Sequence, residues 1–195
     1  MSSETAPTRL RVLNAAWHLL EQGGSTVRMS DIAKKAGISR QALYLHFPNR
    51  ADLLLATTRH IDEVKHVDDR LAPSRAAQNG QARLRLYVEA WGNYIPEIHG
   101  VATALMAMQA TDAEAAKAWE DRMQAVRHGC AAVVHALDAD GDLTTTLSPE
   151  RATDLLWALL SVPTWEQLRV QCDWSQDQYL THIERTAALA LTGEE

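Results

Sequence analysis

Two short helical runs joined by a single glycine, within residues 29–46, restrict the fold of this chain more than any other feature. The first run covers 29–36, Gly37 interrupts it, and the second covers 39–46. Glycine adopts a left-handed backbone conformation at no steric cost, and Ser39 stands where its hydroxyl would cap the second helix. The inward-facing set is apolar, with small alanines where the helices approach: Ile32, Ala33, Ala36, Ile38 and Leu43. The pattern predicts a helix-turn-helix.

The outer surface of the second run carries polar groups suited to DNA. Its first residues, Ser39, Arg40 and Gln41, are predicted to read bases, because arginine and glutamine present paired hydrogen-bonding groups to guanine or adenine in the major groove. Further side chains are predicted to reach phosphates: Lys34, Tyr44, His46 and Arg50. Arg50 also stands at a helix N-terminus, where the backbone favours anions.

Charge is distributed unevenly along the 195 residues, whose net charge is −6. Residues 1–60 contain eight Lys or Arg against four Asp or Glu, whereas the remainder contains 11 against 21. This asymmetry suggests that the N-terminal third meets a polyanion. The negative total disfavours a protein that coats nucleic acid without specificity.

Helical periodicity continues through the rest of the chain, and no segment shows the sustained alternation of a strand. The other expected helices are a first one ending at Gly23-Gly24, a fourth capped by Asn49 and running toward Leu71, one over 84–95, two runs at 101–110 and 112–137, and two last helices beginning at Ser148 and near Ser175. Pro73 and Pro96 are predicted to end helices and Pro163 to kink one. The fold class is therefore all-α, with an N-terminal arm and helix-turn-helix domain over 1–48 and a larger helical domain over 49–195.

Metal, disulfide and membrane signals are weak. Cys130 and Cys172 stand alone, so both are expected to be buried thiols, and no cofactor or metal is expected. The aspartate-rich loop 138–142 has its glycine at the wrong position for a calcium loop, so a solvated turn is expected. Residues 1–8 are polar and no apolar run approaches the ~18 residues of a membrane span, so we expect a soluble, cytoplasmic protein.

Two alternatives to DNA binding can be weighed from the sequence. An enzyme is disfavoured, because the chain contains no G-x-S-x-G, no H-E-x-x-H and no glycine-rich phosphate loop, and pairs such as His60 with His66 lack the i, i+4 spacing of helical zinc ligands. An interaction protein that uses its helices without DNA remains open. Salt dependence separates it from a DNA-binding protein, whose affinity falls steeply as salt rises.

The N-terminal part resembles the DNA-binding domain of the tetracycline-repressor (TetR) family over roughly residues 9–54. The matching features follow in order: Ala15-Ala16, Gly23-Gly24, Asp31-Ile32-Ala33, Ala36-Gly37-Ile38-Ser39, and Leu43-Tyr44-x-His46-Phe47 followed by Arg50 and Leu53. The resemblance implies a sequence-specific transcriptional regulator with an N-terminal DNA-binding domain and a larger helical domain for ligand binding and dimerisation.

Three positions depart from the family pattern. Where relatives usually have a threonine that caps the second helix and meets a phosphate, this chain has Arg28, so both Arg28 and Ser30 are included among the expected phosphate contacts. Gln41 stands where a small residue is common, so its base-reading role is inferred from its chemistry alone. Arg50 replaces the usual lysine and keeps the charge.

The resemblance also implies an effector pocket in the region rich in aromatic and methionine side chains. The expected lining residues are Trp91, Tyr94, His99, Met106, Gln109, Trp119, Met123 and Trp157. Such a pocket suits a small apolar or amphipathic effector, which would swing the fourth helix and change the spacing of two recognition helices. Repression is the commoner habit of the family, so a repressor is expected, although residues alone do not separate it from an activator.

A homodimer is implied as well, because relatives pair through their last two helices and two recognition helices read a palindromic operator. The residues expected at that interface form apolar stripes in the last two helices: Leu156, Leu159, Leu160, Trp165, Tyr179, Ile183 and Ala187.

Overall fold

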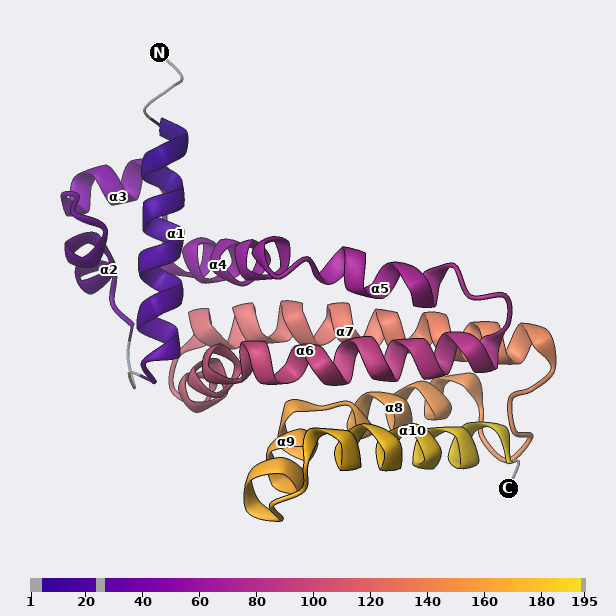
Figure 1. Ribbon diagram of the computed structural model, residues 1–195. Helices are drawn as coiled ribbons and strands as arrows, with labels where there is room; N and C mark the ends of the chain where they lie inside the picture. The colour runs from indigo at the N-terminus through magenta and orange to yellow at the C-terminus, as the bar shows by residue number, and fades with distance from the viewer. Residues whose placement is uncertain (1–4, 24–26, 194–195) are drawn as a thin grey trace. The chain divides into compact units, whose positions relative to one another are not determined.

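The computed structural model describes residues 5–23 and 27–193, and no strand occurs within those ranges, so the predicted all-α class is confirmed (Figure 1). The elements in chain order are α1 (Thr5–Glu21), α2 (Met29–Ala36), α3 (Arg40–His46), α4 (Arg50–Val64), α5 (Val67–Arg75), α6 (Gly80–Gln109), α7 (Ala113–Asp140), α8 (Pro149–Leu159), α9 (Val162–Glu166), the π-helical turn η1 (Gln167–Gln171) and α10 (Gln176–Thr192). None of the helices in the described part of the chain combines the length and apolar character that a membrane crossing requires.

The chain divides into two compact units. The first contains Met1–Lys65 with Ile98–Met123, and the second contains His66–Glu97 with Gln124–Glu195. This division differs from the expected boundary after residue 48, because α4, the end of α6 and the start of α7 pack with the N-terminal helices. Both α6 and α7 therefore contribute residues to each unit.

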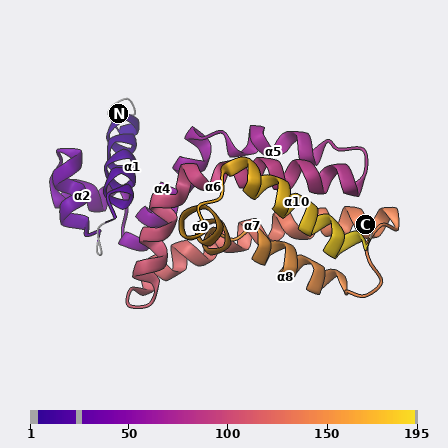
Figure 2. The ribbon, with the colours of Figure 1, turned by 60° about the horizontal axis from the view of Figure 1, so that its bottom comes forward.

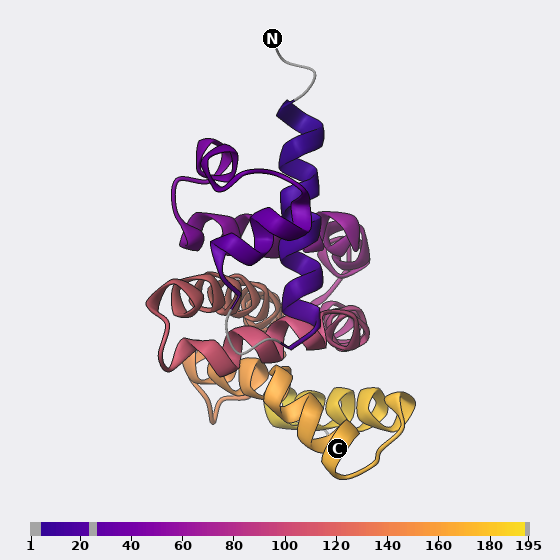
Figure 3. The same cartoon turned by 90° about the vertical axis from the view of Figure 1, so that its left-hand side faces the viewer.

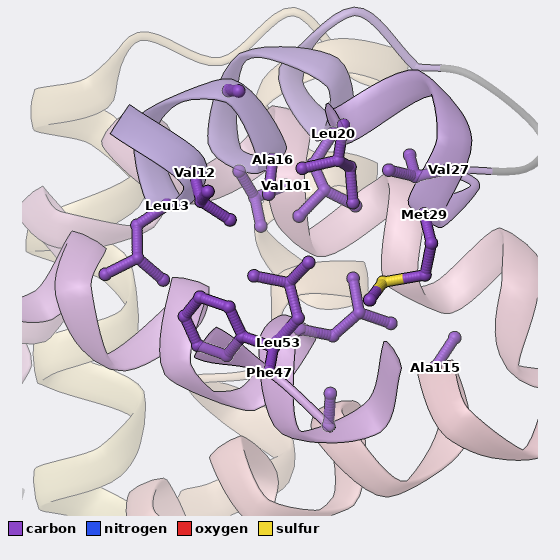
Figure 4. Close-up of a cluster of buried hydrophobic side chains, with 14 of the residues drawn as sticks. Val12, Leu13, Ala16, Leu20, Val27, Met29, Phe47, Leu53, Val101 and Ala115 are labelled. Atoms are coloured by element: carbon purple, nitrogen blue, oxygen red, sulfur yellow. The ribbon is translucent and has the colours of Figure 1, made fainter. Parts of the chain in front are cut away.

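The first unit is built on a shared apolar core (Figure 4). Ala16 and Leu20 of α1, Leu53 of α4, Val101 of α6 and Ala115 of α7 all lie in this cluster, and each is at most 5% exposed. Figure 1 shows α2 and α3 on one side of α1, and Figure 3 faces that side. The helices of the helix-turn-helix thus share their core with parts of the chain that lie far away in the sequence.

Local signals for helix ends were read correctly at several places. The side chain of Asn49 accepts a hydrogen bond from Asp52 N at 2.8 Å at the start of α4. The hydroxyls of Ser148 and Ser175 cap α8 and α10 in the same way. Gly23 follows α1 with a φ of 69°, while Gly24 lies outside the described residues.

Three prolines did not act as predicted. α5 runs through Pro73 without ending there. α6 is 30 residues long and contains Pro96 within it. A helix can continue through a proline where the packing of neighbouring side chains outweighs the lost hydrogen bond, and Tyr94 and Ile95 are buried directly before Pro96 in α6. Pro163 lies in the first turn of α9, where its missing N–H is not needed, so it begins a helix and does not kink one.

In the second unit, α8 and α10 lie side by side, joined through α9 and η1 (Figure 2). α6 and α7 approach closely enough that a Cβ on Gly129 would come within 2.2 Å of the Tyr87 hydroxyl. Cys130 is buried there, and burial raises the pKa of its thiol to about 12. Cys172 is exposed at the end of η1, so the expectation of two buried thiols was wrong for this residue.

Candidate nucleic-acid interface

The turn between α2 and α3 has the geometry that the sequence predicts. Gly37 adopts the left-handed conformation with a φ of 67°, and its N–H donates to the Lys34 carbonyl at 3.2 Å. The Ser39 hydroxyl accepts a hydrogen bond from Ala42 N at 3.1 Å and caps α3. The predicted inward set is buried except for Ile38, which is half-buried against the core. These contacts fix which side of α3 faces outward.

The outward side of α3 is polar at its start and contains one large apolar residue further on. The predicted base-reading residues Ser39, Arg40 and Gln41 are all exposed. Tyr44 is 42% exposed, and Leu45 is 83% exposed. Leu43, which lies between Gln41 and Tyr44 in the sequence, is fully buried, so the helix has one distinct inner and one distinct outer face.

The candidate phosphate contacts other than Arg50 lie around this face. Arg28, Ser30 and Lys34 are exposed on or beside α2, and His46 is half-buried at the end of α3. Arg28 occupies the position before α2 without making a side-chain cap, in agreement with the departure noted in the sequence. Their contacts with DNA stay predictions. No acidic residue occurs between Ile32 and Ala51, so the surface is suited to a polyanion.

Arg50 is positioned differently from the expectation. Its side chain is only 11% exposed, and its guanidinium donates to Asp112 Oδ2 at 2.6 Å and to the Val27 carbonyl. Its Nη2 also lies 3.6 Å from the Met108 sulfur. With its donors directed into the protein, Arg50 is not available to a phosphate in this conformation, and we assign it an internal role instead.

Asp112 connects the start of α4 to the start of α7. Its Oδ1 accepts hydrogen bonds from Glu114 N and Ala115 N, both at 3.1 Å, which caps α7. Burial alone would raise the pKa of the Asp112 carboxyl, but the hydrogen bonds from Ala115 and Arg50 and the Arg50 charge together lower it. Glu114 in turn accepts from Ala51 N at 3.3 Å in the first turn of α4.

A second set of ion pairs joins α4 and α7 one or more turns further along. Arg122 of α7 donates to Asp62 of α4 at 2.6 Å, and Arg59 of α4 donates to Asp121 at 3.2 Å. Burial tends to raise the pKa of Asp121, but hydrogen bonding and charge from Arg122, followed by Arg59, lower it below its ordinary value. The first unit thus holds α4 against α7 by charge as well as by apolar packing.

The eight residues expected to line an effector pocket are divided between the two units. Trp91, Tyr94 and Trp157 belong to the second unit, and the other five belong to the first. Trp91 and Tyr94 are buried, with the Trp91 Nε1 donating to the Leu160 carbonyl at 2.9 Å. Gln109 is exposed, and the remaining five are half-buried: His99, Met106, Trp119, Met123 and Trp157.

An open groove of about 510 Å³ lies elsewhere in the second unit, between the start of α6 and the end of α10. Its lining includes Asn79, Arg85, Arg185 and Leu189 and none of the eight expected residues. Among the residues that the structure describes, no group of three or more His, Cys, Asp or Glu side chains is arranged to hold a metal ion.

The residues expected at a dimer interface are already covered within the single chain. Of the seven, Leu159 alone is half-buried, while the other six are at most 6% exposed: Leu156, Leu160, Trp165, Tyr179, Ile183 and Ala187. They form the contact between α8, α9, α10 and the rest of their own unit, which leaves them almost no surface to offer a second copy.

Two features of this region were missed from the sequence. Leu45 carried a usable signal, because it lies two positions from buried Leu43 and hence ~200° around the helix. The ion pair between Arg50 and Asp112 carried no signal in the sequence, because the two residues are 62 positions apart and no local pattern links them.

Comparison with known proteins identifies the family. A family model described as bacterial regulatory proteins, tetR family, matches residues 12–57. The HTH-type transcriptional regulator EthR of Mycobacterium tuberculosis is 31% identical over 149 residues, which cover 75% of this chain and 69% of EthR.

Solved structures agree with this match at the level of the fold. NalD, the secondary repressor of the MexAB-OprM multidrug efflux pump in Pseudomonas aeruginosa, superposes with a TM-score of 0.70 at 22% identity, covering 98% of this chain and 100% of NalD. FadR of Bacillus subtilis in complex with stearoyl-CoA gives 0.71 at 14% identity, covering 95% and 99%. The chain belongs to the tetR family of bacterial regulatory proteins and is a transcriptional regulator, not an enzyme.

Proposed function

We propose that this regulator is a homodimeric repressor that binds a palindromic operator and is released by a small apolar or amphipathic effector. The observation that carries the proposal is the outer face of α3, where Arg40, Gln41 and Tyr44 are exposed above a buried Leu43. A short helix held by its inner face and free on its outer face suits the major groove. The surrounding acid-free segment favours the approach of DNA.

The side chains on this surface divide into two roles. Ser39, Arg40 and Gln41 stand at the start of α3 and read bases, because this end of a recognition helix approaches the base edges. Arg28, Ser30, Lys34, Tyr44 and His46 lie around it and contact phosphates, which fix the position of the helix without selecting sequence. Arg50 contributes indirectly by holding the start of α4.

The effector is proposed to bind a largely apolar pocket. Support comes from the buried and half-buried aromatic and methionine side chains named above, and from FadR, a structural neighbour that binds stearoyl-CoA. NalD, which shares the fold, is a repressor, and this favours repression here. Release follows if the effector prefers a conformation that binds DNA less well, typically by ~1–3 kcal/mol.

The Arg50–Asp112 pair offers a route for this coupling inside the first unit. Asp112 lies in the turn between α6 and α7, and Arg50 is the first residue of α4. A shift of that turn would pull on α4 through a short ion pair and through the hydrogen bond from Ala51 N to Glu114. α4 follows α3 directly, so its movement changes the placement of the recognition helix.

Dimerisation is proposed to use the apolar residues of α8 and α10 that remain uncovered. Leu155 and Leu159 are half-buried along one edge of α8, and Leu189 of α10 is 39% exposed. A lysine at position 159 should therefore convert the dimer to a monomer in sedimentation experiments, whereas Leu45→Lys should leave the mass unchanged. A dimer that survives Leu159→Lys and Leu189→Lys together would place the interface elsewhere.

The test of the main proposal is a binding titration with DNA from the region upstream of the protein's own gene, at two salt concentrations, beside an unrelated fragment of equal length. Nanomolar, salt-sensitive binding that prefers the first fragment is the expected result. A reporter under the same promoter then separates repression from activation. Equal and weak binding to both fragments, followed by failure to enrich any sequence from a random pool, would refute sequence-specific DNA binding.

A further inference from the structure

Leu45 is the most exposed large apolar side chain among the residues that the structure describes. It is 83% exposed, whereas the next, Val170, is 60% exposed. Leu43 and Phe47 on the same segment are buried at 0% and 2%. At ~100° per residue, Leu45 therefore points almost directly away from the inner face of α3. Leu45 is therefore available to whatever the outer face of α3 contacts.

Its surroundings favour DNA over a protein partner. Gln41 lies one turn before it on the same face, and Arg40 and Tyr44 lie together along one side of that face. A protein that docks through apolar contact needs a contiguous apolar patch, and a single leucine ringed by polar and basic groups does not provide one. The absence of acidic residues from Ile32 to Ala51 is complementary to a polyanion.

The major groove offers one apolar group on its base edges, the C5 methyl of thymine. Gln41 is suited to adenine N6 and N7, and Leu45 follows it by four residues on the outer face. A helix that brings Gln41 to one base pair therefore presents Leu45 to a neighbouring position in the same groove. The leucine side chain can bury a methyl group there and has no polar atom that would favour the other bases.

We propose that Leu45 is a specificity-determining residue that selects thymine at one position of each operator half-site by contact with its C5 methyl group. This inference rests on the proposed function, since it requires α3 to enter the major groove. It adds an apolar component to a recognition surface that otherwise reads through hydrogen bonds. Leu45 thereby joins Ser39, Arg40 and Gln41 among the residues that set the operator sequence.

The experiment begins with selection of preferred duplexes from a random pool by the full-length wild-type protein. Each thymine of the selected sequence is then replaced in turn by deoxyuridine, which lacks only the methyl group. We expect one thymine in each half-site at which the replacement weakens wild-type binding about fourfold, the equivalent of one buried methyl group. Leu45→Ala should bind the original duplex more weakly and should show no further loss with deoxyuridine.

Val64→Ala serves as the matched control, because Val64 is a 45% exposed apolar residue at the end of α4, away from the recognition helix. It should keep the full sensitivity to deoxyuridine. The exposure of Leu45 means that its truncation leaves no cavity, and a thermal melt of Leu45→Ala checks this.

Three results would overturn the inference in different ways. Equal sensitivity to deoxyuridine in Leu45→Ala and wild type would assign the methyl contact to another residue. No sensitivity at any thymine, or wild-type affinity of Leu45→Ala for every duplex, would show that Leu45 does not meet a base. Failure of the wild type to select any sequence would refute the proposed function itself, and the inference with it.

Discussion

Replacing Arg50 by methionine and Asp112 by asparagine, singly and together, measures how strongly the start of α4 is tied to the start of α7. Methionine keeps the length of the arginine stem without its charge. Asparagine keeps the hydrogen-bond acceptor that caps α7, because asparagine and aspartate cap helices about equally well. The pair of changes therefore isolates the ion pair from the cap.

The magnitude follows from the partial burial of the pair. Exposed ion pairs contribute ~0.2–1 kcal/mol, whereas breaking a fully buried pair costs ~3–5 kcal/mol. The side chains of Arg50 and Asp112 are 11% and 21% exposed, and Glu114 Oε2 lies 3.6 Å from the same guanidinium nitrogen. We expect a coupling free energy of ~1–2 kcal/mol in the double-mutant cycle, because Glu114 keeps part of the compensating charge when Asp112 is neutralised.

The assay is urea denaturation at one fixed protein concentration, since the stability of a dimer depends on concentration. The control cycle uses Arg85 and Glu89, an exposed pair at i, i+4 whose side chains are 54% and 57% exposed, for which ~0.3–0.5 kcal/mol is expected. Because the pKa of Asp112 is lowered in the folded state, its contribution is present above the ordinary carboxyl value of 3.8 and is lost as the pH falls through the lowered value.

DNA binding provides the second measurement. If Arg50 acts inside the protein, Arg50→Met should leave the salt dependence of operator binding unchanged. A phosphate contact would instead reduce the slope by about one and leave stability nearly untouched. That second outcome, together with a coupling below ~0.5 kcal/mol, would refute the internal role and restore the assignment made from the sequence.

The remaining predictions concern side chains of α2 and α3 and two glycines. Arg40→Ala should weaken operator binding by ~1–3 kcal/mol and relax the base preference at one operator position. Lys34→Ala should weaken binding to all sequences alike and lower the slope of affinity against salt by about one. A binding selection and a salt titration that show the same effects for both variants would contradict the assignment of Arg40 to bases and Lys34 to phosphates. Gly37→Ala should cost ~1–2 kcal/mol in thermal or urea unfolding through backbone strain alone, since its φ is 67° and no atom lies within 4 Å of the added Cβ, and Gly37→Asn should cost less. Gly80→Ala should cost more than Gly37→Ala, because its Cβ would come within 2.6 Å of the backbone nitrogen of Leu137; a smaller loss would show that α6 and α7 move apart easily.

Much of the fold follows from local sequence. The bounds of α2 agree with the predicted run of 29–36. Both signals for this helix are local, since its apolar spacing predicts the helix and Gly37 directly after it predicts the end. The Asn49 cap of α4 and the starts of α8 and α10 were predicted for the same reason. The path of α6 through Pro96 was not found, because the local pattern shows the missing hydrogen bond but not whether packing outweighs it.

The candidate interface shows the same limit. The exposure of Arg40 and Gln41 could be deduced from the apolar inward set of the helix-turn-helix, whose member in α3 is Leu43. The partner of Arg50 could not be deduced, because a guanidinium binds a phosphate and a carboxylate equally well. Which of the two it meets depends on the position of the α6–α7 turn, where Asp112 lies. A charged residue at the start of a helix is therefore weak evidence for a ligand until its internal partners are known.

The apolar stripes of α8 and α10 raise a related problem. Helical spacing tells which residues leave water, but it does not tell whether they meet their own chain or a second copy. Tyr179, Ile183 and Ala187 fill the core of their own unit, so the helix must carry further apolar groups if it is also to pair with a partner. A helix used on two sides needs a stripe wider than one contact requires, and Leu155 and Leu159, beside the buried Leu156, widen the stripe of α8 in this way. An apolar stripe alone does not indicate an interface; apolar residues that remain uncovered after the stripe has packed into its own core do.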